Sequence, residues 1–368
     1  MPRTGACSAT IAAPPCTNLK IADFDFTLPP ELIAQEPSPR RGGSRLLALD
    51  RHSGLITDQH FHALPTLLQP GDLLVVNNTR VFSARLLGTR LPGGGAAECL
   101  LVRKLRDDDG EVWEALVHPG QRLKEGSQMR FASGVHVIHA EVLDRRFHGR
   151  RSVRLWTDGG SLTDAIDVIG HVPLPPYIKR PDAFVDRDRY QTVYAESRGS
   201  IAAPTAGLHF TPELLAALDA RGVERTAITL HVGYGTFQPI RAEYVHDHEM
   251  EEEHYEVPAD AALAITKARR EGRRVIAVGT TTTRTLESLH LTDDGAVEPG
   301  TGSTNLFIFP GYQFRIVTGL ITNFHLPKSS LLLLVSAFAG QERVLAAYHH
   351  AVTERYRFYS YGDAMLVI

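Results

Sequence analysis

The stretch Ser200–Phe237, SIAAPTAGLHFTPELLAALDARGVERTAITLHVGYGTF, carries the local signals that decide the fold. A loop of small residues leads to Thr211, which we expect to cap a helix that begins at Pro212. Leucines recur in it at helical spacing, and Gly222 stands where a helix needs a left-handed residue to end. An apolar, β-branched strand then runs from Arg225. A loop, a capped helix and a strand in this order predict an α/β unit.

Two histidines lie at the loop junctions of this unit. His209 follows the loop that contains Pro204 and Thr205, and His231 precedes the glycines at 233 and 235. Either histidine could be a packing residue, but loops held by rigid elements are where chemistry concentrates. The surrounding glycines and proline favour a functional pair.

The composition is that of an ordinary globular protein, with 43% apolar and 22% charged residues and a formal net charge of -3. Three cysteines at irregular spacing predict neither a disulfide framework nor a zinc site. The longest apolar run, residues 331–340, is about half the length of a membrane span. We expect a soluble, cytoplasmic protein with a loose extension over residues 1–20.

The rest of the chain shows two kinds of secondary-structure pattern. Seven short strands separated by turns predict a small all-β barrel over residues 75–157. Strand–loop–helix units before and after it predict a discontinuous α/β/α body formed by residues 21–74 and 158–368. The expected fold is therefore α/β, a three-layer α/β/α body with an inserted β-barrel.

Two further units carry polar groups where a predicted strand ends, the position at which open α/β sheets bind ligands. In VGTTTTRTLES, the threonines from Thr280 and the guanidinium of Arg284 could hold a ribose, a carboxylate or a phosphate, or could simply cap a helix. In LITNFHLPKSS, one turn brings together Asn323, His325 and Lys328 before a very apolar helix. A purely structural role remains an alternative for each cluster.

Three other features are ambiguous between structure and function. Asn77 and Asn78 precede Arg80 at a strand end, where asparagines either cap hairpins or bind ligands. The acidic run from Glu249 to Glu256 is either a solvated face or a site for a cationic substrate. Its histidines lack the spacing of a helical zinc motif, so we expect no metal.

The predicted barrel is basic, whereas the rest of the chain is acidic. Residues 75–157 contain 14 lysines and arginines and 9 acidic residues, a formal +5 that leaves -8 for the remainder. Arg146, Arg150 and Arg151 cluster at one hairpin, where they could neutralise nucleic-acid phosphates. The alternative is a charged edge that keeps a barrel strand from pairing with other chains.

Long motifs along the chain resemble one known family, the S-adenosylmethionine:tRNA ribosyltransferase-isomerases of queuosine biosynthesis. The resemblance runs from about Phe24 to the C-terminus, with mild departures at Tyr234 and at Thr282-Thr283. Its motifs are FDFTLPPELIAQEPSPRR, GDLLVVNNTRVFSARLLG, HVPLPPYIKR, AAPTAGLHFT, LHVGYGTF, HEMEEEHYEV, VGTTTTRTLES, PGYQFRIVTGLITNFHLPKSSLLLLVSAFAG and YRFYSYGDAML.

The resemblance implies an enzyme that transfers and isomerises the ribosyl moiety of S-adenosylmethionine onto 7-aminomethyl-7-deazaguanine at the wobble position of tRNA anticodons. The product is epoxyqueuosine, and adenine and methionine are released. S-adenosylmethionine is then a consumed co-substrate, and no cofactor or metal is implied. We expect a monomer that binds tRNA and no membrane.

The expected site residues fall into three groups, and the hairpin arginines among them are predicted from charge alone, because the turn from Arg146 to Arg151 lies outside the matched motifs. His209, His231 and His325 are the acid–base candidates, because histidine titrates near neutral pH. The expected S-adenosylmethionine contacts are Pro204, Thr205, Gly207, Gly233, Gly235, Thr236, Thr280, Thr281, Arg284, Asn323 and Lys328. The expected nucleic-acid contacts are Asn77, Asn78, Arg80, Arg146, Arg150 and Arg151.

Two alternatives remain open from the sequence. One is an S-adenosylmethionine-dependent RNA methyltransferase, although the Gly-x-Gly-x-x-Gly fingerprint of a nucleotide-binding strand–helix turn is missing. The other is a non-catalytic tRNA-binding module.

Overall fold

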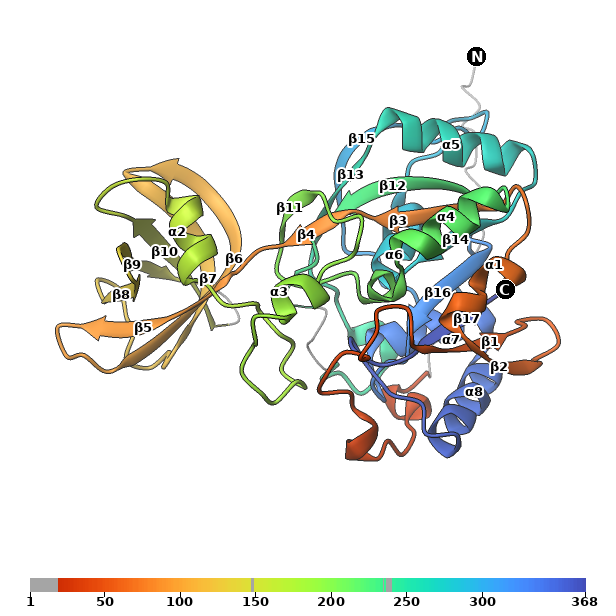
Figure 1. Cartoon of the computed structure of the whole chain (residues 1–368), viewed down its shortest axis with the longest axis horizontal. Helices are drawn as coiled ribbons and strands as arrows, with labels where there is room; N and C mark the ends of the chain where they lie inside the picture. The colour runs from red at the N-terminus through yellow and green to blue at the C-terminus, as the bar shows by residue number, and fades with distance from the viewer. Residues whose placement is uncertain (1–18, 147–148, 234, 236–239) are drawn as a thin grey trace, which may run out of the picture.

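The computed structural model describes residues 19–146, 149–233, 235 and 240–368. A large α/β body and a separate β-barrel make up the molecule, and β4 (Thr79–Val81) and β11 (Ser197–Ser200) pair where they meet (Figure 1). Thr236 lies outside the described residues.

The body is built on one mixed sheet of nine strands. In spatial order these are β15 (Gly300–Thr304), β13 (Glu253–Val257), β12 (Glu224–Leu230), β3 (Leu73–Asn77), β14 (Val275–Val278), β16 (Gly319–Asn323), β17 (Ala364–Val367), β1 (Arg45–Leu49) and β2 (Ile56–His60). Strands β12, β3, β14 and β16 run parallel, and β17 turns antiparallel to β16.

Alternate residues of the central strands enter two different cores. Leu73 and Val75 of β3 face one side of the sheet, whereas Leu74 and Val76 face the other. This is the expected alternation of a strand buried on both faces. The body is therefore the predicted three-layer α/β/α sandwich.

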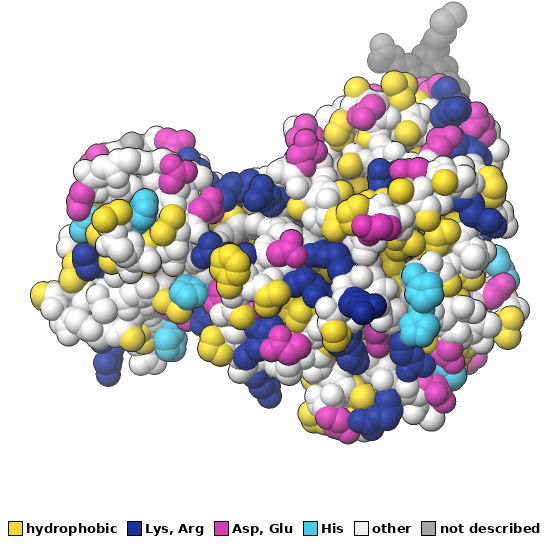
Figure 2. Space-filling model, viewed as in Figure 1, with side chains coloured by type: hydrophobic (Ala, Val, Ile, Leu, Met, Phe, Trp, Pro, Cys, Tyr) yellow, Lys and Arg dark blue, Asp and Glu magenta, His cyan; other side chains and the backbone are white. Residues whose placement is uncertain are grey.

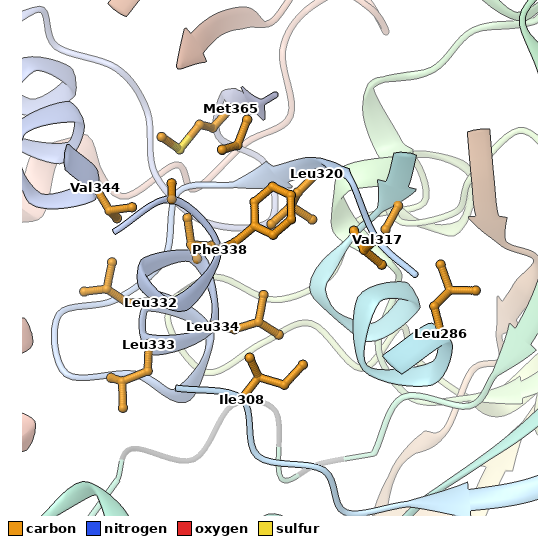
Figure 3. Close-up of a cluster of buried hydrophobic side chains, with 14 of the residues drawn as sticks. Leu286, Ile308, Val317, Leu320, Leu332, Leu333, Leu334, Phe338, Val344 and Met365 are labelled. Carbon is orange, nitrogen blue, oxygen red and sulfur yellow. The ribbon is translucent and has the colours of Figure 1, made fainter. Parts of the chain in front are cut away.

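In the part of the chain that the structure describes, four α-helices cover the first face and two cover the second. The first group is α5 (Ala259–Arg270), α6 (Thr280–Ser288), α7 (Ser330–Ala339) and α8 (Gln341–Thr353), and the second is α1 (Leu64–Leu67) and α4 (Pro212–Ala220). Figure 3 shows Leu332, Leu334 and Phe338 of α7 inserted among the side chains of the first core. As predicted, Thr211 caps α4 by accepting a hydrogen bond from the backbone of Leu214 at 3.2 Å.

Six strands close the barrel. Their order is β10 (Arg150–Trp156), β7 (Gly110–His118), β6 (Ala96–Asp108), β5 (Arg85–Leu91), β8 (Gln128–Ser133) and β9 (His136–Arg145). The helix α2 (Leu162–Ile169) packs its buried face, which includes Ile166, onto the barrel core. The barrel unit thus extends beyond residue 157.

The predicted start of the barrel at residue 75 differs from the structure. Residue 75 falls inside β3, which is buried throughout and pairs with β12 and β14 at the centre of the body sheet. A short strand with no polar face matches either a barrel or a sheet covered on both sides, so the pattern alone could not separate them. The barrel strands begin at Arg85.

Among the described residues, no single helix is long and apolar enough to cross a membrane. Only α7 and α8 taken together, across a 116° bend, match a span in length and composition. The same part of the chain contains no group of three or more histidine, cysteine or acidic side chains that could hold a metal ion.

Candidate active site

The carboxyl ends of four parallel strands meet at one edge of the body sheet. β3 ends at Asn77, β12 ends just before His231, β14 leads into Gly279, and β16 ends at Asn323. Open α/β sheets bind ligands at this edge because the loops there diverge. The predicted junctions at Asn77, His231, Gly279 and Asn323 lie here.

A cavity of about 70 Å³ opens at this edge. It is lined by loops 202–206, 279–281 and 322–326, together with Val232, Tyr177 and Tyr359. Six of the residues predicted to bind or act on substrate line it: Pro204, Thr205, Thr280, Thr281, Asn323 and His325. Folding brings them together from segments more than a hundred residues apart.

Two buried polar atoms in the lining have no hydrogen-bond partner among the described residues, the Oδ1 of Asn323 and the hydroxyl of Tyr359. Three acceptors fix the amide orientation, since the Nδ2 of Asn323 donates to the carbonyl of Tyr359 at 2.9 Å and to the Nε2 of His209 at 3.1 Å, with the carbonyl of Asp363 at 3.5 Å. Buried polar groups are nearly always paired, so these two atoms indicate a polar ligand.

Tyr359 is held in an unusual conformation. Its φ of 72° lies in the left-handed region, which a bulky residue seldom occupies. Its ring stacks on Tyr177 with centroids 4.3 Å apart. Strain of this kind concentrates at functional sites.

Two threonines at the beginning of α6 line the cavity, whereas the hydroxyls of three others are bonded to the protein backbone. The hydroxyls of Thr282, Thr283 and Thr285 donate to backbone carbonyls one turn earlier. Thr280 and Thr281 line the cavity next to the helix N-terminus, where free N–H groups favour an anion. Gly279 precedes them at φ 97° and ψ 151°, a conformation that is essentially restricted to glycine.

The three histidines occupy different positions. His325 lines the cavity, and its Nε2 lies 2.8 Å from the hydroxyl of Thr322. His209 is behind the wall, because its Nε2 accepts from Asn323 and its Nδ1 must therefore carry the proton that bonds Ser44 at 2.9 Å. Burial lowers the pKa of His325 to about 3 and that of His209 to about 4, so both are neutral at pH 7.

His231 lies in a second, larger space between the barrel and the body. This cleft of about 570 Å³ is also lined by Gly233, by the acidic residues 251–253 and by Arg150 and Trp113 of the barrel. The Nδ1 of His231 lies 2.8 Å from the hydroxyl of Thr79, and burial lowers its pKa. Val232 lines both the cleft and the cavity, so the two are neighbours.

Five of the predicted S-adenosylmethionine contacts that the structure describes lie outside the cavity lining, and one of them, Gly233, lines the cleft instead. The guanidinium of Arg284 is buried against the carboxylate of Glu253 at 2.6 Å. Lys328 pairs with Asp25 at 2.6 Å. A Cβ on Gly207 would meet Tyr194, and one on Gly235 would meet Glu251, so both glycines serve close packing.

The predicted nucleic-acid contacts are also divided. Asn77 is fully buried, and its amide bonds the backbone of Leu230, which makes it structural. Asn78 accepts from Thr229 at 2.6 Å. Arg80 is exposed.

The three hairpin arginines do not form an edge of free cations. Arg150 bonds Glu251 at 2.5 Å and Glu114 at 3.2 Å, whereas Arg151 is buried and donates to three backbone carbonyls. Arg146 bonds Ser152 at 2.6 Å and lies 3.6 Å from Asp144. Partners that follow from tertiary contact, such as Glu251, could not be assigned from the hairpin sequence.

Sequence reasoning missed Tyr177 and Tyr359 as cavity residues. Both belong to motifs that carry the family resemblance, HVPLPPYIKR and YRFYSYGDAML. A tyrosine in a turn-rich segment gives no local sign that its hydroxyl is buried, so their place in the site depends on the fold.

Fold and site together define an α/β protein with a ligand cavity at the carboxyl edge of its sheet and a barrel across a cleft from it. Comparison with known proteins is specific: the model of the queuosine biosynthesis protein family matches residues 21–367, and the chain belongs to that family.

Two similar proteins share one name. A protein from Carboxydothermus hydrogenoformans called S-adenosylmethionine:tRNA ribosyltransferase-isomerase is 52% identical over 95% of this chain and all of the relative. One of the same name from Desulfitobacterium hafniense is 50% identical over the same shares. The crystal structure of S-adenosylmethionine tRNA ribosyltransferase from Thermotoga maritima, at 37% identity, covers 94% of this chain and 100% of its own with a TM-score of 0.53.

Proposed function

We propose that this chain is an S-adenosylmethionine:tRNA ribosyltransferase-isomerase. It transfers the ribosyl moiety of S-adenosylmethionine to 7-aminomethyl-7-deazaguanine in a tRNA anticodon, forms epoxyqueuosine, and releases adenine and methionine. The observation that carries the proposal is the match to relatives of that name at about half identity over 95% of the chain. The methyltransferase and the non-catalytic module are not favoured.

The two neighbouring spaces suit two substrates. The small cavity, with the Thr280–Thr281 helix start and the unpaired atoms of Asn323 and Tyr359, suits polar parts of S-adenosylmethionine such as its carboxylate or ribose hydroxyls. The larger cleft has the volume of a ligand site. Glu251 and Glu253 in its lining are paired with arginines, so the carboxylate of Glu252, which has no ion pair among the described residues, suits the cationic aminomethyl group of the nucleobase.

The chemistry requires a base that removes a proton from the carbon beside the sulfonium, and a donor that assists adenine departure. Within the cavity, His325 is the base candidate by position, since it lines the cavity and its Nδ1 is not used by the bond to Thr322. His231 in the cleft is the candidate donor for the second role. His209 positions the Asn323 amide. A monomer in the cytoplasm, where tRNA is modified, remains part of the proposal.

Product analysis tests the activity. The protein is incubated with S-adenosylmethionine and an anticodon stem-loop RNA that contains 7-aminomethyl-7-deazaguanine, and a stem-loop with guanine serves as control. Free adenine and methionine should appear in equal amounts with the modified RNA only. S-adenosylhomocysteine would instead identify a methyltransferase, and unchanged S-adenosylmethionine a binding module.

The same assay tests His325. His325→Ala should slow adenine release by roughly a hundredfold to ten-thousandfold, the usual contribution of general acid–base assistance. His290→Ala is the matched control, because the His290 side chain is 74% exposed and outside both spaces. Turnover of His325→Ala equal to that of the control would remove His325 from the reaction.

A further inference from the structure

Arginines gather around the short helix α3 (Asp186–Arg189), between the barrel and the body. Arg187 lines a hollow of about 230 Å³ together with Arg80 and Arg198. Arg189, on the same helix, lines a second hollow with Arg40 and Arg41. Figure 2 shows lysine and arginine side chains spread over the middle of this face, where Figure 1 places α3. We call these six arginines the α3 band.

Most of the charge of the α3 band is uncompensated. Arg198 pairs with Asp167 at 2.7 Å, and Arg41 lies 3.3 Å from Asp188. The ion pairs among the described residues include no carboxylate for the other four, Arg40, Arg80, Arg187 and Arg189. Two of these four arginines, Arg187 and Arg189, donate to uncharged backbone carbonyls.

The backbone holds Arg187 and Arg189 in place without cancelling their charge. Arg187 donates to the carbonyls of Asp167 and Gly170 at 2.9 and 3.0 Å, and Arg189 donates to that of Ser38 at 2.6 Å. Burial, and then the neighbouring charge of Arg41, lower the pKa of Arg189. Arginines held in place with their charge intact raise the local positive potential, and such a potential attracts a polyanion.

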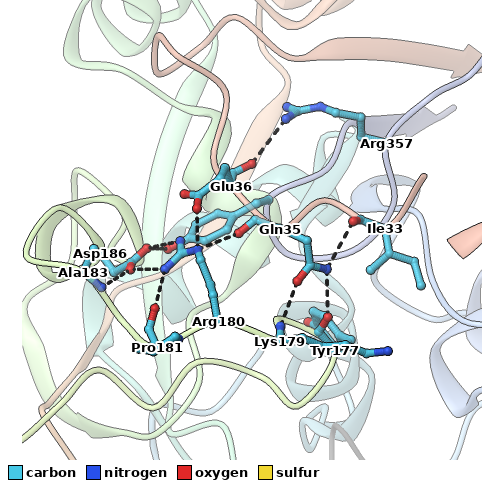
Figure 4. A network of polar contacts seen from close by, with 11 residues as sticks. Ile33, Gln35, Glu36, Tyr177, Lys179, Arg180, Pro181, Ala183, Asp186 and Arg357 are labelled. Atoms are coloured by element: carbon cyan, nitrogen blue, oxygen red, sulfur yellow. Dashed lines mark hydrogen bonds and ion pairs between the residues drawn. The ribbon is translucent and has the colours of Figure 1, made fainter. Parts of the chain in front are cut away.

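An exposed aromatic ring stands next to the α3 band. Phe184 is 88% exposed, and the backbone N–H of Arg187 donates to its carbonyl at 3.2 Å. The guanidinium of Arg180 holds the segment of Phe184 and α3 in place, because it donates to the buried carboxylate of Asp186 through two bonds of 2.7 and 2.9 Å (Figure 4). Burial alone would raise the pKa of Asp186, but the bonds from Arg180 and Ala183 outweigh it and keep the carboxylate charged.

The α3 band is continuous with the site. Phe82 and Arg198 line both the hollow of Arg80 and the cleft of His231. Val232 in turn lines both the cleft and the cavity of Asn323. If one nucleotide of an RNA entered the cleft, the phosphates of the neighbouring nucleotides would lie against the arginines of the α3 band.

We infer that the α3 band is the surface that binds the anticodon loop of the tRNA, with phosphates on its unpaired arginines and an unstacked base on Phe184. The inference rests on the proposed function and places the RNA away from the barrel hairpin of Arg150 and Arg151. Proteins bind single-stranded RNA in this way, through a basic surface that follows the backbone and aromatic rings on which bases stack.

The salt dependence of RNA binding tests the charges. Arg40→Ala/Arg80→Ala removes two exposed arginines, and the probe is the anticodon stem-loop RNA with 7-aminomethyl-7-deazaguanine. Each lost phosphate contact reduces the slope of log affinity against log salt by roughly 0.7 to 1, so the double variant should lose about 1.5 to 2 units. The control Arg122→Ala/Arg145→Ala removes two exposed arginines of the barrel and should keep the wild-type slope.

The ring is tested separately. Phe184→Ala should weaken RNA binding by roughly fivefold to a hundredfold, the range for one lost base–aromatic stack. Leu263→Ala is its control, since Leu263 is 72% exposed on α5. Binding of S-adenosylmethionine should be unchanged in every variant, which shows that the fold and the cavity are intact.

A slope for Arg40→Ala/Arg80→Ala equal to that of the barrel control, or full RNA affinity in Phe184→Ala, would overturn the inference. Adenine release by the wild-type protein separates this failure from failure of the proposed function. If the wild-type protein releases adenine but the variants bind RNA as the wild type does, the protein is the proposed enzyme and binds its RNA on another surface.

Discussion

At the residue scale, one amide organises the cavity. The Nδ2 of Asn323 is committed to His209 and to the backbone of Tyr359, so its Oδ1 is left facing a space that its own chain does not fill. The hydroxyl of Tyr359 is in the same state. A substrate that supplies partners to both atoms gains hydrogen bonds without breaking any inside the protein.

Removing the hydroxyl of Tyr359 therefore has opposite effects on stability and on binding. Tyr359→Phe should leave the free energy of unfolding unchanged or slightly higher, because a buried group without a partner is lost. Binding of S-adenosylmethionine should weaken by about twofold to tenfold, the value of one hydrogen bond. Calorimetric titration and chemical denaturation measure the two quantities.

Tyr194→Phe is the matched control for this change. The hydroxyl of Tyr194 is also buried without a partner among the described residues, but Tyr194 does not line the cavity. Equal affinities of the two variants for S-adenosylmethionine would show that the hydroxyl of Tyr359 does not contact the substrate.

The buried histidines make stability depend on pH. The pKa of His209 is about 4 in the folded protein and about 6.5 when the chain is unfolded. Below pH 6.5 the unfolded chain binds the proton more readily, so stability falls as the pH drops and levels off below 4. From pH 7 to pH 5, His209 alone should cost about 2 kcal/mol.

Chemical denaturation of wild type and His209→Gln at pH 7 and pH 5 measures this term. The substitution shifts stability at both pH values, so the difference between the two is the relevant quantity. It should be about 2 kcal/mol smaller in His209→Gln. The same difference in both proteins would mean that His209 titrates normally in the folded state.

At the scale of elements, α6 connects the cavity to the cleft. Its first residues line the cavity, and its Arg284 binds the Glu253 carboxylate, which also accepts from the backbone of Gly233 at 3.0 Å. The buried ion pair thus fixes the loop after His231 to the helix that begins at Thr280.

Arg284→Ala should be strongly destabilising because it leaves the Glu253 carboxylate buried without its cation. Loss of one partner of a buried pair costs about 3–5 kcal/mol. Arg284→Met/Glu253→Gln removes both charges and should recover part of that loss in a denaturation experiment. A stable Arg284→Ala protein that no longer binds S-adenosylmethionine would instead support the direct substrate contact expected from the sequence.

At the scale of the whole molecule, side-chain bonds such as Arg150–Glu251 link the barrel to the body, and a pair of backbone hydrogen bonds closes the base of the barrel. The backbones of Arg85 and His171 bond each other in both directions, at 3.3 and 2.9 Å, where the chain enters and leaves the barrel. None of the described residues of the intervening segment, 86–146 and 149–170, lines the Asn323 cavity. The barrel and the cavity are therefore separable in sequence.

Replacing residues 85–171 with a short glycine linker should leave a folded body. This body should bind S-adenosylmethionine but should not catalyse the RNA-dependent reaction. Deleting 85–156 alone should give an aggregating protein, because α2 would lose the barrel core that covers Ile166. Thermal unfolding and calorimetric titration check both variants. If the 85–171 replacement does not fold, the barrel is required by the body and the boundary is not a domain boundary.

The sequence by itself determined the architecture. Alternating and continuous apolar strands, the Thr211 cap and the glycine turns are local signals, and they correctly predicted a three-layer body with an inserted β-barrel. The same logic placed polar loops at the ends of parallel strands, and six of the predicted contacts line the cavity. These features could be predicted because each depends on residues close together in the chain.

Only the tertiary structure decided which polar groups are available to a ligand. Arg284 and Arg150 looked free in the sequence but meet Glu253 and Glu251, whereas Arg187 and Arg189 lie in an Asp/Arg-rich segment and yet keep their charge because carbonyls bind them. The place of β3 in the body sheet and the burial of the Tyr359 hydroxyl could not be predicted for the same reason. Charge neutralisation and burial depend on contacts between distant segments, and a local pattern does not contain them.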